Sequence, residues 1–92
     1  ESLAWQKDLN FALEEARAEN KPIMIDFYAD WCAACKELDQ KTYSDPNVQN
    51  ALERFIIVKI DMTRNTDVTN RYKKLYKIIG LPLVIFYDSS GH

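Results

Sequence analysis

The chain has 92 residues, of which 47% are hydrophobic and 28% charged, and its formal net charge at pH 7 is −2. These values predict one small domain, residues 1–92, and exclude the strong positive charge with which proteins attract nucleic acid or anionic membranes. No apolar run approaches the roughly 20 residues of a membrane-spanning helix, and no secretory signal peptide is recognisable.

The first third of the chain predicts a helix followed by a strand. Alternating residues at 2–7 favour a brief edge strand, and Asp8 suits the N-cap of a helix over Leu9–Asn20. Pro22 ends that helix, because the residue before a proline avoids helical geometry. The apolar run 23–28 then predicts a strand buried on both faces, as in parallel sheets.

Asp26 interrupts this apolar run. Two interpretations stay open for it. It is either a solvated carboxylate at the end of the strand, or a buried proton acceptor beneath the cysteines that follow, with a raised pKa.

The only two cysteines, Cys32 and Cys35, follow the strand and lie in the first turn of a predicted helix over 33–42. The first turn of a helix carries unpaired N–H groups and the positive end of the macrodipole, which stabilise a thiolate. We therefore expect Cys32 to be the attacking thiol and the less exposed Cys35 to resolve the mixed disulfide.

Three other interpretations of the cysteine pair compete with redox chemistry. A structural disulfide would stabilise weakly, because it closes a very short loop. A zinc site needs four ligands, and the single histidine, His92, is the last residue. The third alternative is a pair of inert buried thiols. A C-x-x-C motif between a hydrophobic strand and a helix favours thiol–disulfide exchange over all three.

Several carboxylates lie near the cysteines in sequence, and negative charge raises a thiol pKa. Lys36 acts in the opposite direction. We expect a Cys32 thiol that is less acidic than in strong oxidants, which favours a reductant. The carboxylates are Asp26, Asp30, Glu37 and Asp39.

The remaining elements follow from caps and apolar runs. Asp45-Pro46 predicts a new helix, and residues 56–62 predict a second strand that ends near a solvated Asp61. Residues 65–67 supply caps for a helix to about residue 78, which Gly80 ends. A last strand over 81–87 and a turn over 88–91 close the chain.

The helix after residue 67 has two sides. One side is predicted to present the apolar residues Val68, Tyr72, Leu75 and Ile79. Its C-terminal end carries a cluster of cations, which is either a basic docking patch or a solvated face that matches the helix dipole. The cations are Arg71, Lys73, Lys74 and Lys77.

Strands that alternate with helices predict an α/β fold with a mostly parallel or mixed central sheet flanked by helices. The stretch Asp26-Phe-Tyr-Ala-Asp-Trp-Cys-Ala-Ala-Cys-Lys36 resembles the active-site signature of the thioredoxin superfamily, and Gly80-Leu-Pro82 resembles its cis-proline segment. With Thr42-Tyr-Ser-Asp-Pro-Asn-Val48, these motifs are most similar to the C-terminal periplasmic thioredoxin-like domains of the transmembrane thiol:disulfide interchange (DsbD) family. The resemblance covers residues from about 20 to 91.

The resemblance implies roles for individual residues. Cys32 would be the nucleophile and Cys35 the resolving thiol, tuned by the acidic pair Asp26 and Asp39.

Around the cysteines, the resemblance implies that Pro82 is cis and packs against the disulfide. The backbone of Leu81 would pair with an extended partner segment. Trp31 would either shield the cysteines or be ordinary half-buried packing.

The implied activity is a protein-disulfide reductase relay in the bacterial periplasm, within a membrane protein. Its partners would be protein thiols and disulfides, namely a membrane-embedded dithiol donor and a periplasmic thiol acceptor. It would need no cofactor or metal beyond the redox-active Cys32–Cys35 disulfide. The alternatives are a stand-alone thioredoxin-like reductase, cytoplasmic or serving cytochrome c maturation, and a non-catalytic binding module with the same fold.

Two departures from the superfamily pattern affect these expectations. Ala33-Ala34 is neither the Gly-Pro pair of thioredoxin nor a pair found in strong oxidants, so the direction of electron flow is less defined than the chemistry. The sequence begins without Met, so we expect that an upstream segment was removed or never included. It also lacks the last strand and helix of the usual fold, so we expect a domain truncated at its C-terminus, or an open sheet edge beside residues 83–87.

Overall fold

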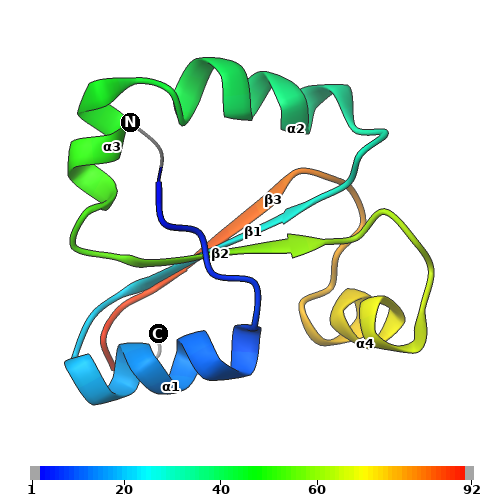
Figure 1. Cartoon of the computed structure of the whole chain (residues 1–92). Coiled ribbons are helices and arrows are strands. Elements are labelled where there is room, and N and C mark those ends of the chain that lie inside the picture. Colours follow the sequence, from blue (N-terminus) through cyan, green and yellow to red (C-terminus); the bar gives the residue numbers. More distant parts are fainter. Residues whose placement is uncertain (1–2, 91–92) are drawn as a thin grey trace.

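A computed structural model describes residues 3–90. A three-stranded sheet lies between two helical layers, with α1 and α4 on one face and α2, η1 and α3 on the other (Figure 1). This arrangement is a thioredoxin-like α/β fold, as predicted. In chain order the elements are α1 (Leu9–Glu19), β1 (Ile23–Tyr28), α2 (Ala33–Glu37), η1 (Leu38–Thr42), α3 (Pro46–Leu52), β2 (Ile56–Asp61), α4 (Asp67–Leu75) and β3 (Leu83–Tyr87).

The sheet has the strand order β2-β1-β3, with β1 parallel to β2 and antiparallel to β3. The predicted N-terminal edge strand is reduced to a single parallel bridge. Gln6 pairs with Val58 at the outer side of β2, with its N–H 2.8 Å from the Ile57 carbonyl oxygen. Within residues 3–90, the outer edge of β3 has no strand partner.

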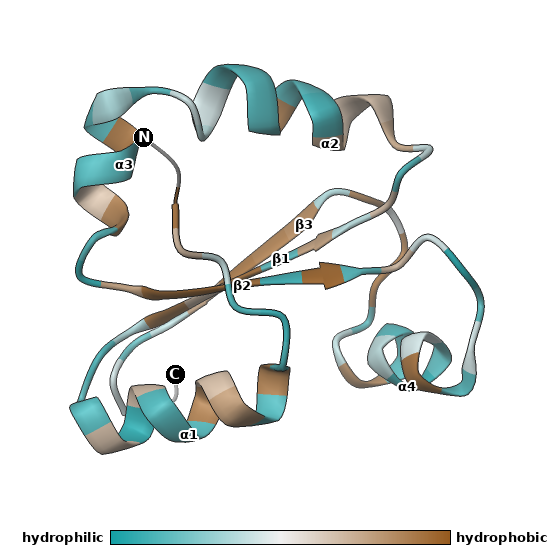
Figure 2. Cartoon of the chain, viewed as in Figure 1, coloured by the Kyte–Doolittle hydropathy of each residue, from teal (hydrophilic) through white to brown (hydrophobic). Residues whose placement is uncertain are grey.

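Alternation along β1 divides the sheet into two different faces. Alternate residues of β1 point toward α1, namely Ile23, Ile25 and Phe27. They join an apolar core that also includes Tyr72 of α4 and Tyr76, which directly follows α4. Figure 2 shows the apolar residues of the strands concentrated between the layers.

The opposite face of β1 presents Met24, Asp26 and Tyr28 toward α2, η1 and α3. Met24 packs there with Tyr43 and Leu52 in a second, smaller cluster. The helix that begins at the cysteines, α2, therefore covers the face of the sheet on which Asp26 lies.

Local capping signals correctly predicted where two helices begin. The Asp8 carboxylate accepts the Phe11 N–H at 3.0 Å, and the Asp45 carboxylate accepts the Asn47 N–H at 2.8 Å ahead of Pro46. The predicted helix over 33–42 changes type after Glu37, because the Tyr43 N–H bonds to the Leu38 carbonyl five residues earlier, at 3.0 Å. Residues 38–42 are thus a π-helix, which is uncommon and often occurs at functional sites.

The C-terminal end of α4 differs from the prediction. The helix ends at Leu75, and Lys77, not Gly80, is the nearby residue with a left-handed φ of 55°. The predicted apolar side is not a buried face, since Val68, Leu75 and Ile79 are 49%, 66% and 103% exposed. Of the four predicted residues, Tyr72 packs against the core.

The last strand begins at Leu83, two residues later than predicted. In the turn after it, the Ser90 N–H bonds to the Asp88 carboxylate at 3.0 Å, and the predicted final turn residue, Gly91, lies outside the described residues. Every helix within residues 3–90 is too short or too polar to cross a bilayer.

Candidate active site

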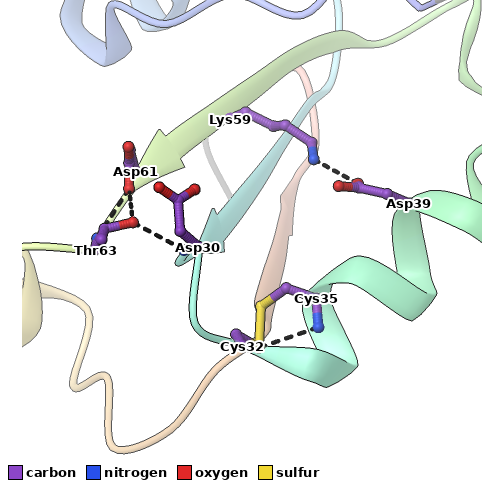
Figure 3. The surroundings of a disulfide bond; sticks show 7 residues. All are labelled: Asp30, Cys32, Cys35, Asp39, Lys59, Asp61 and Thr63. Atoms are coloured by element: carbon purple, nitrogen blue, oxygen red, sulfur yellow. Dashed lines mark hydrogen bonds and ion pairs between the residues drawn. A yellow bond between two sulfur atoms is a disulfide. The ribbon is translucent and has the colours of Figure 1, made fainter.

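The two cysteines form a disulfide at the start of α2, with Cα atoms 5.2 Å apart. Cys32 is the N-cap residue with φ −91° and ψ 106°, so its side chain points back over the first turn. Its Sγ accepts the Cys35 N–H at 3.0 Å (Figure 3). This N–H is one of the donors left unpaired at a helix start, and it stabilises negative charge on Cys32.

Solvent exposure distinguishes the two sulfurs less than predicted. Cys32 is 6% exposed and Cys35 is 4% exposed. The two sulfurs differ chemically because Cys32 is the N-cap residue and its Sγ accepts a hydrogen bond. Ala33 and Ala34 beside them are exposed, so the N-terminal end of α2 lies at the surface.

Leu81 packs against the cysteines, together with Tyr28. The Leu81–Pro82 peptide bond is cis, which confirms the predicted isomer. The cysteine cluster is thus covered by the residue that precedes Pro82. Leu81 also precedes β3, whose ladder with β1 begins at Leu83.

The turn before Cys32 is held by the loop that follows β2 (Figure 3). Thr63 Oγ1 accepts the Asp30 N–H at 2.9 Å, and the Thr63 carbonyl accepts the Trp31 indole N–H at 3.2 Å. Asp61 in turn accepts the Thr63 N–H at 2.9 Å. Sequence reasoning took Asp61 for a merely solvated strand end and missed Thr63.

Trp31 is 67% exposed, so the half-buried packing considered for it is wrong. The partly buried residues packed on the cysteine cluster are Tyr28 and Leu81. Trp31 instead stands at the surface beside Cys32, anchored through its indole N–H.

Asp26 is buried, with 2% of its surface exposed, so the solvated alternative is wrong. Desolvation raises the pKa of its carboxyl; a hydrogen bond from Tyr43 and the charge of Lys59 lower this pKa, and the charge of Asp39 raises it. Its Oδ1 atom has no hydrogen-bond partner. An unpartnered, buried carboxylate oxygen is well suited to accept a proton.

The pKa of Tyr43 is raised, mainly by burial and then by the Asp26 charge. Tyr43 therefore stays a neutral donor toward Asp26. It follows the π-helix directly and packs edge-on against Trp5, with ring centroids 5.0 Å apart.

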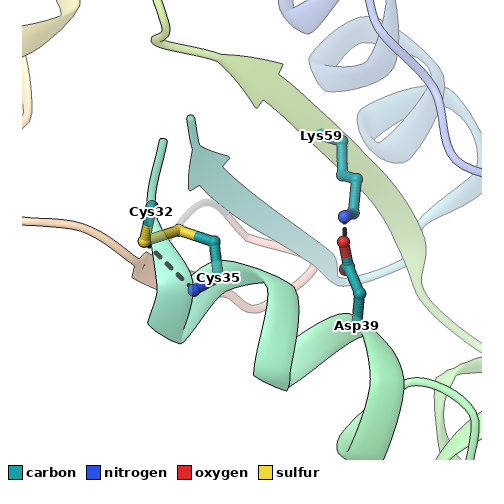
Figure 4. A network of polar contacts seen from close by, with 4 residues as sticks. All are labelled: Cys32, Cys35, Asp39 and Lys59. Carbon is teal, nitrogen blue, oxygen red and sulfur yellow. Dashed lines mark hydrogen bonds and ion pairs between the residues drawn. A yellow bond between two sulfur atoms is a disulfide. The ribbon is translucent and has the colours of Figure 1, made fainter. Parts of the chain in front are cut away.

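Asp39 pairs with Lys59, whose ammonium lies 2.5 Å from the Asp39 carboxylate (Figure 4). Lys59 is directly opposite Asp26 in the β1–β2 register. Its Nζ lies 4.9 Å from the centroid of the Tyr28 ring, with the rings of Trp5 and Tyr43 at 5.3 and 5.6 Å. Such contacts between cations and aromatic faces are favourable.

The sequence analysis missed Lys59, although the signal was a lone cation within the apolar run 56–62. The pairing also changes the electrostatics expected at the cysteines, because two of the four nearby carboxylates have lysine partners. Glu37 pairs with Lys41 at 3.0 Å, and Asp39 pairs with Lys59.

The structure bears on two of the alternatives for the cysteine pair, free thiols and a metal site. Since the sulfurs are bonded to each other, free inert thiols are excluded. No group of three or more candidate metal ligands occurs within residues 3–90, and His92 lies outside the described residues. A bonded pair at a helix N-terminus has the parts required for thiol–disulfide exchange.

Comparison with known proteins agrees with this geometry. A family described as thioredoxin-like matches residues 4–89. The DsbD thiol:disulfide interchange proteins of Pectobacterium atrosepticum and Cronobacter sakazakii are 44% and 42% identical over 91% and 98% of this chain. The chain spans 14% and 15% of the length of these relatives.

Among solved structures, the oxidised C-terminal domain of Neisseria meningitidis DsbD is 38% identical, with a TM-score of 0.81. The match covers 97% of this chain and 81% of that domain. The chain therefore belongs to the thioredoxin-like family, within the group formed by the C-terminal domains of DsbD.

Proposed function

We propose that this domain is a protein-disulfide reductase that exchanges its Cys32–Cys35 dithiol with the disulfide of a protein partner. The observation that carries the proposal is the disulfide at the N-terminus of α2, with Cys32 Sγ accepting the Cys35 N–H at 3.0 Å. The similarity to DsbD C-terminal domains supports the same chemistry.

The reaction begins from the reduced domain. The Cys32 thiolate attacks one sulfur of the partner's disulfide, which forms a mixed disulfide and releases the other partner sulfur as a thiolate. Cys35 then loses its proton and attacks Cys32 Sγ, so that the domain's own disulfide forms and the second partner thiol leaves. Two electrons pass to the partner, and two protons end on its thiols.

Asp26 is the proposed acceptor of the Cys35 proton. Its side chain faces the layer formed by α2 and η1, and its Oδ1 lacks a hydrogen-bond partner. Desolvation raises its pKa toward the working pH, which is the condition for efficient general base catalysis. Asp39 contributes through its charge, which opposes the ionisation of Asp26 and is itself balanced by Lys59.

Partner binding is proposed to involve Trp31, Leu81 and Pro82. Leu81 contacts the cysteine cluster, and it lies outside the β3 ladder. Its backbone is therefore placed to pair with an extended segment of the partner. The exposed Trp31 ring would cover the apolar part of that segment.

The proposed setting is the periplasm, where the domain would take electrons from a membrane-embedded dithiol and pass them to another thiol domain. The curated relatives are named thiol:disulfide interchange proteins, which supports the exchange of electrons with other thiol proteins. The carboxylates near the cysteines favour a reductant, and Asp30 forms no ion pair within residues 3–90.

A Cys35→Ser variant tests the function, because it cannot resolve the mixed disulfide. Incubated with periplasmic extract under native conditions, it should capture a partner through Cys32, and reducing agent should release that partner. Cys32→Ser is the matched control and should capture none.

The wild-type domain should also reduce insulin with dithiothreitol as electron source. Equal capture by both serine variants, or no insulin reduction by the folded wild-type domain, would contradict the proposed function.

A further inference from the structure

The N-terminal segment, residues 3–7, lies against the outer side of β2, far from the cysteines in the sequence. The Gln6 N–H donates to the Ile57 carbonyl at 2.8 Å, and the Lys59 N–H donates to the Gln6 carbonyl at 2.9 Å. Figure 1 shows this segment crossing beside β2 before α1 begins. Two backbone hydrogen bonds therefore fix the position of Trp5, the residue before Gln6, relative to Lys59.

Trp5 covers the side chain of Lys59 from this position. Its ring centroid lies 5.3 Å from the Lys59 Nζ atom, and the rings of Tyr28 and Tyr43 lie 4.9 and 5.6 Å from the same atom. The negative faces of aromatic rings attract an ammonium group, and the attraction is stronger where water is excluded. The Lys59 side chain is only 17% exposed, so three rings hold its charge in a partly dry place.

The three rings differ in their other contacts. Tyr28 packs on the cysteine cluster, and Tyr43 donates a hydrogen bond to Asp26. Trp5 packs on the cluster around Met24 and touches the Tyr43 ring edge-on, with centroids 5.0 Å apart. Of the three, Trp5 is therefore the residue whose substitution best isolates the hold on the ammonium.

The place of the Lys59 ammonium matters for the base of the proposed reaction. Its Nζ lies 2.5 Å from the Asp39 carboxylate (Figure 4), and Lys59 is directly opposite Asp26 in the β1–β2 register. The charge of Lys59 lowers the pKa of the Asp26 carboxyl, and the charge of Asp39 raises it. Both effects depend on distance and on intervening water. A lysine stem is flexible, so the pKa of Asp26 depends on what holds the ammonium.

A surface hollow adjoins this ion pair. Its lining includes Trp5, Asp39, Tyr43 and Lys59. The Trp5 ring thus stands at the border between the Lys59 ammonium and the solvent. Without the ring, the hollow would widen, and water would screen the charge of Lys59 from the carboxyl of Asp26.

We propose that Trp5 is a positioning residue of the exchange reaction, which holds the Lys59 ammonium beside Asp39 on the face of the sheet that carries Asp26. This inference rests on the proposed function, in which Asp26 accepts the Cys35 proton. It adds the residue that sets the strength of this base from the far side of β2. Trp5 acts through Lys59 and not on the reacting sulfurs.

Other ionisable groups also surround Asp26 and Lys59. They are Tyr28 on β1, Asp39 on η1, Tyr43 after η1, Asp61 on β2 and Lys7 before α1. A substitution of Trp5 changes none of them. In the oxidised domain the two cysteines at the start of α2 are bonded to each other and do not titrate.

The test compares Trp5→Leu with Trp5→Phe, because leucine removes the aromatic face and phenylalanine keeps one. The pKa of Asp26 is followed in the oxidised domain by NMR of isotope-labelled aspartate carboxyl groups. Trp5→Leu weakens the effect of Lys59, so it should raise this pKa by about half a pH unit, a fraction of the roughly 1–3 units that a close opposite charge contributes. Trp5→Phe should keep most of the wild-type value.

Phe55→Leu is the matched control. Phe55 packs on the same cluster as Trp5, but the cation over its ring is Arg54, at 5.6 Å. This variant removes the same kind of contact and should leave the pKa of Asp26 unchanged. An equal rise in both leucine variants would mean that packing sets this pKa, which would overturn the inference. If Trp5→Leu fails to fold, Trp5→Met gives the same comparison, because it also lacks an aromatic face and fills more of the space.

The Lys59→Met background separates positioning from a direct effect of the ring. Without the ammonium, Trp5 has no charge to hold. The double variant Trp5→Leu/Lys59→Met should therefore have the same Asp26 pKa as Lys59→Met alone. A further rise in the double variant, or an unchanged pKa in Trp5→Leu, would overturn this inference and leave the proposed function intact.

The exchange reaction gives an independent readout. The pre-reduced domain is mixed with insulin, and the pH at which its rate is half maximal should move upward in Trp5→Leu together with the pKa of Asp26. A pKa that rises while the pH profile stays fixed would overturn the role of Trp5 in the reaction. Failure of the wild-type domain to reduce insulin at any pH would instead overturn the proposed function, and the titration would still decide whether Trp5 positions Lys59.

Discussion

The two faces of the central sheet are built from alternate residues of the same strands, yet they differ in kind. Toward α1, β1 presents Ile25 and Phe27, which are fully buried among apolar neighbours. Toward α2 and η1, it presents Asp26, opposite Lys59 on β2. The first face holds the domain together, and the second carries ionisable groups on the side where the cysteine-bearing helix packs. The comparison predicts that variants of the first face change stability, whereas variants of the second change chemistry.

The largest expected effect belongs to the apolar face. Phe27→Ala removes a fully buried ring that contacts Tyr76 at a centroid distance of 5.1 Å. It should lower the free energy of unfolding by about 3–5 kcal/mol, measured by urea denaturation. Phe86→Ala is the matched control, because Phe86 is 55% exposed, and it should cost much less. The rate of exchange per folded molecule should not change. A slower rate would contradict the prediction that variants of this face change stability alone.

Asp26→Asn should have the opposite signature. It removes a buried ionisable group, so at pH 8 the oxidised domain should be more stable by roughly 1–3 kcal/mol, while disulfide exchange slows about 100-fold. The control Asp67→Asn, at an exposed position in the first turn of α4, should change neither. A loss of stability in Asp26→Asn would show that its carboxyl is structural.

The pH dependence of stability gives the sign of the same effect. Burial raises the pKa of Asp26 in the folded state, so the folded domain holds this proton more tightly than the unfolded chain. Stability should therefore fall as pH rises from about 3.9, the ordinary Asp value, through the raised pKa, and then level off. Asp26→Asn should lack this decline in denaturation measured between pH 4 and 9.

Lys59→Met should have a smaller effect that sharpens the comparison. The positive charge of Lys59 lowers the pKa of Asp26, so its loss should move the midpoint of the pH dependence upward, both in stability and in exchange rate. Lys41→Met breaks the exposed pair with Glu37 and should leave the midpoint unchanged. Equal shifts in the two variants would indicate a general charge effect and not a local one.

The smallest expected effect lies in the turn before the cysteines. Thr63→Val removes the acceptor of the Asp30 N–H and should lower the free energy of unfolding by about 1 kcal/mol. Thr42→Val, at an exposed position that ends η1, is the control for the same chemical change. An equal loss of stability in both variants would mean that the turn does not depend on this hydrogen bond.

The sequence allowed prediction wherever a signal is local. The caps at Asp8 and Asp45 were predictable, because a carboxylate satisfies N–H groups two or three residues away. The position of the cysteines after a buried strand was predictable for a similar reason. These features depend on a few neighbouring residues and little else.

The features that sequence reasoning missed depend on distant contacts. Nothing between Leu38 and Thr42 signals a π-helix, and the residue that follows it packs against Trp5 near the N-terminus. A lysine within a strand is usually solvated, but Lys59 lies against three rings that come from separate segments. The end of α4 was misjudged because Lys77 adopts the left-handed conformation that glycine usually takes.

The chain has two tryptophans in contrasting surroundings. The indole of Trp31 is exposed and immediately precedes Cys32, whereas Trp5 packs against Tyr43. Because a disulfide quenches nearby indole emission, the fluorescence of Trp31 should brighten when the sulfurs are reduced. A Trp5→Phe variant would leave a single tryptophan among five tyrosines, and selective excitation of its indole would follow electron transfer in real time without any label.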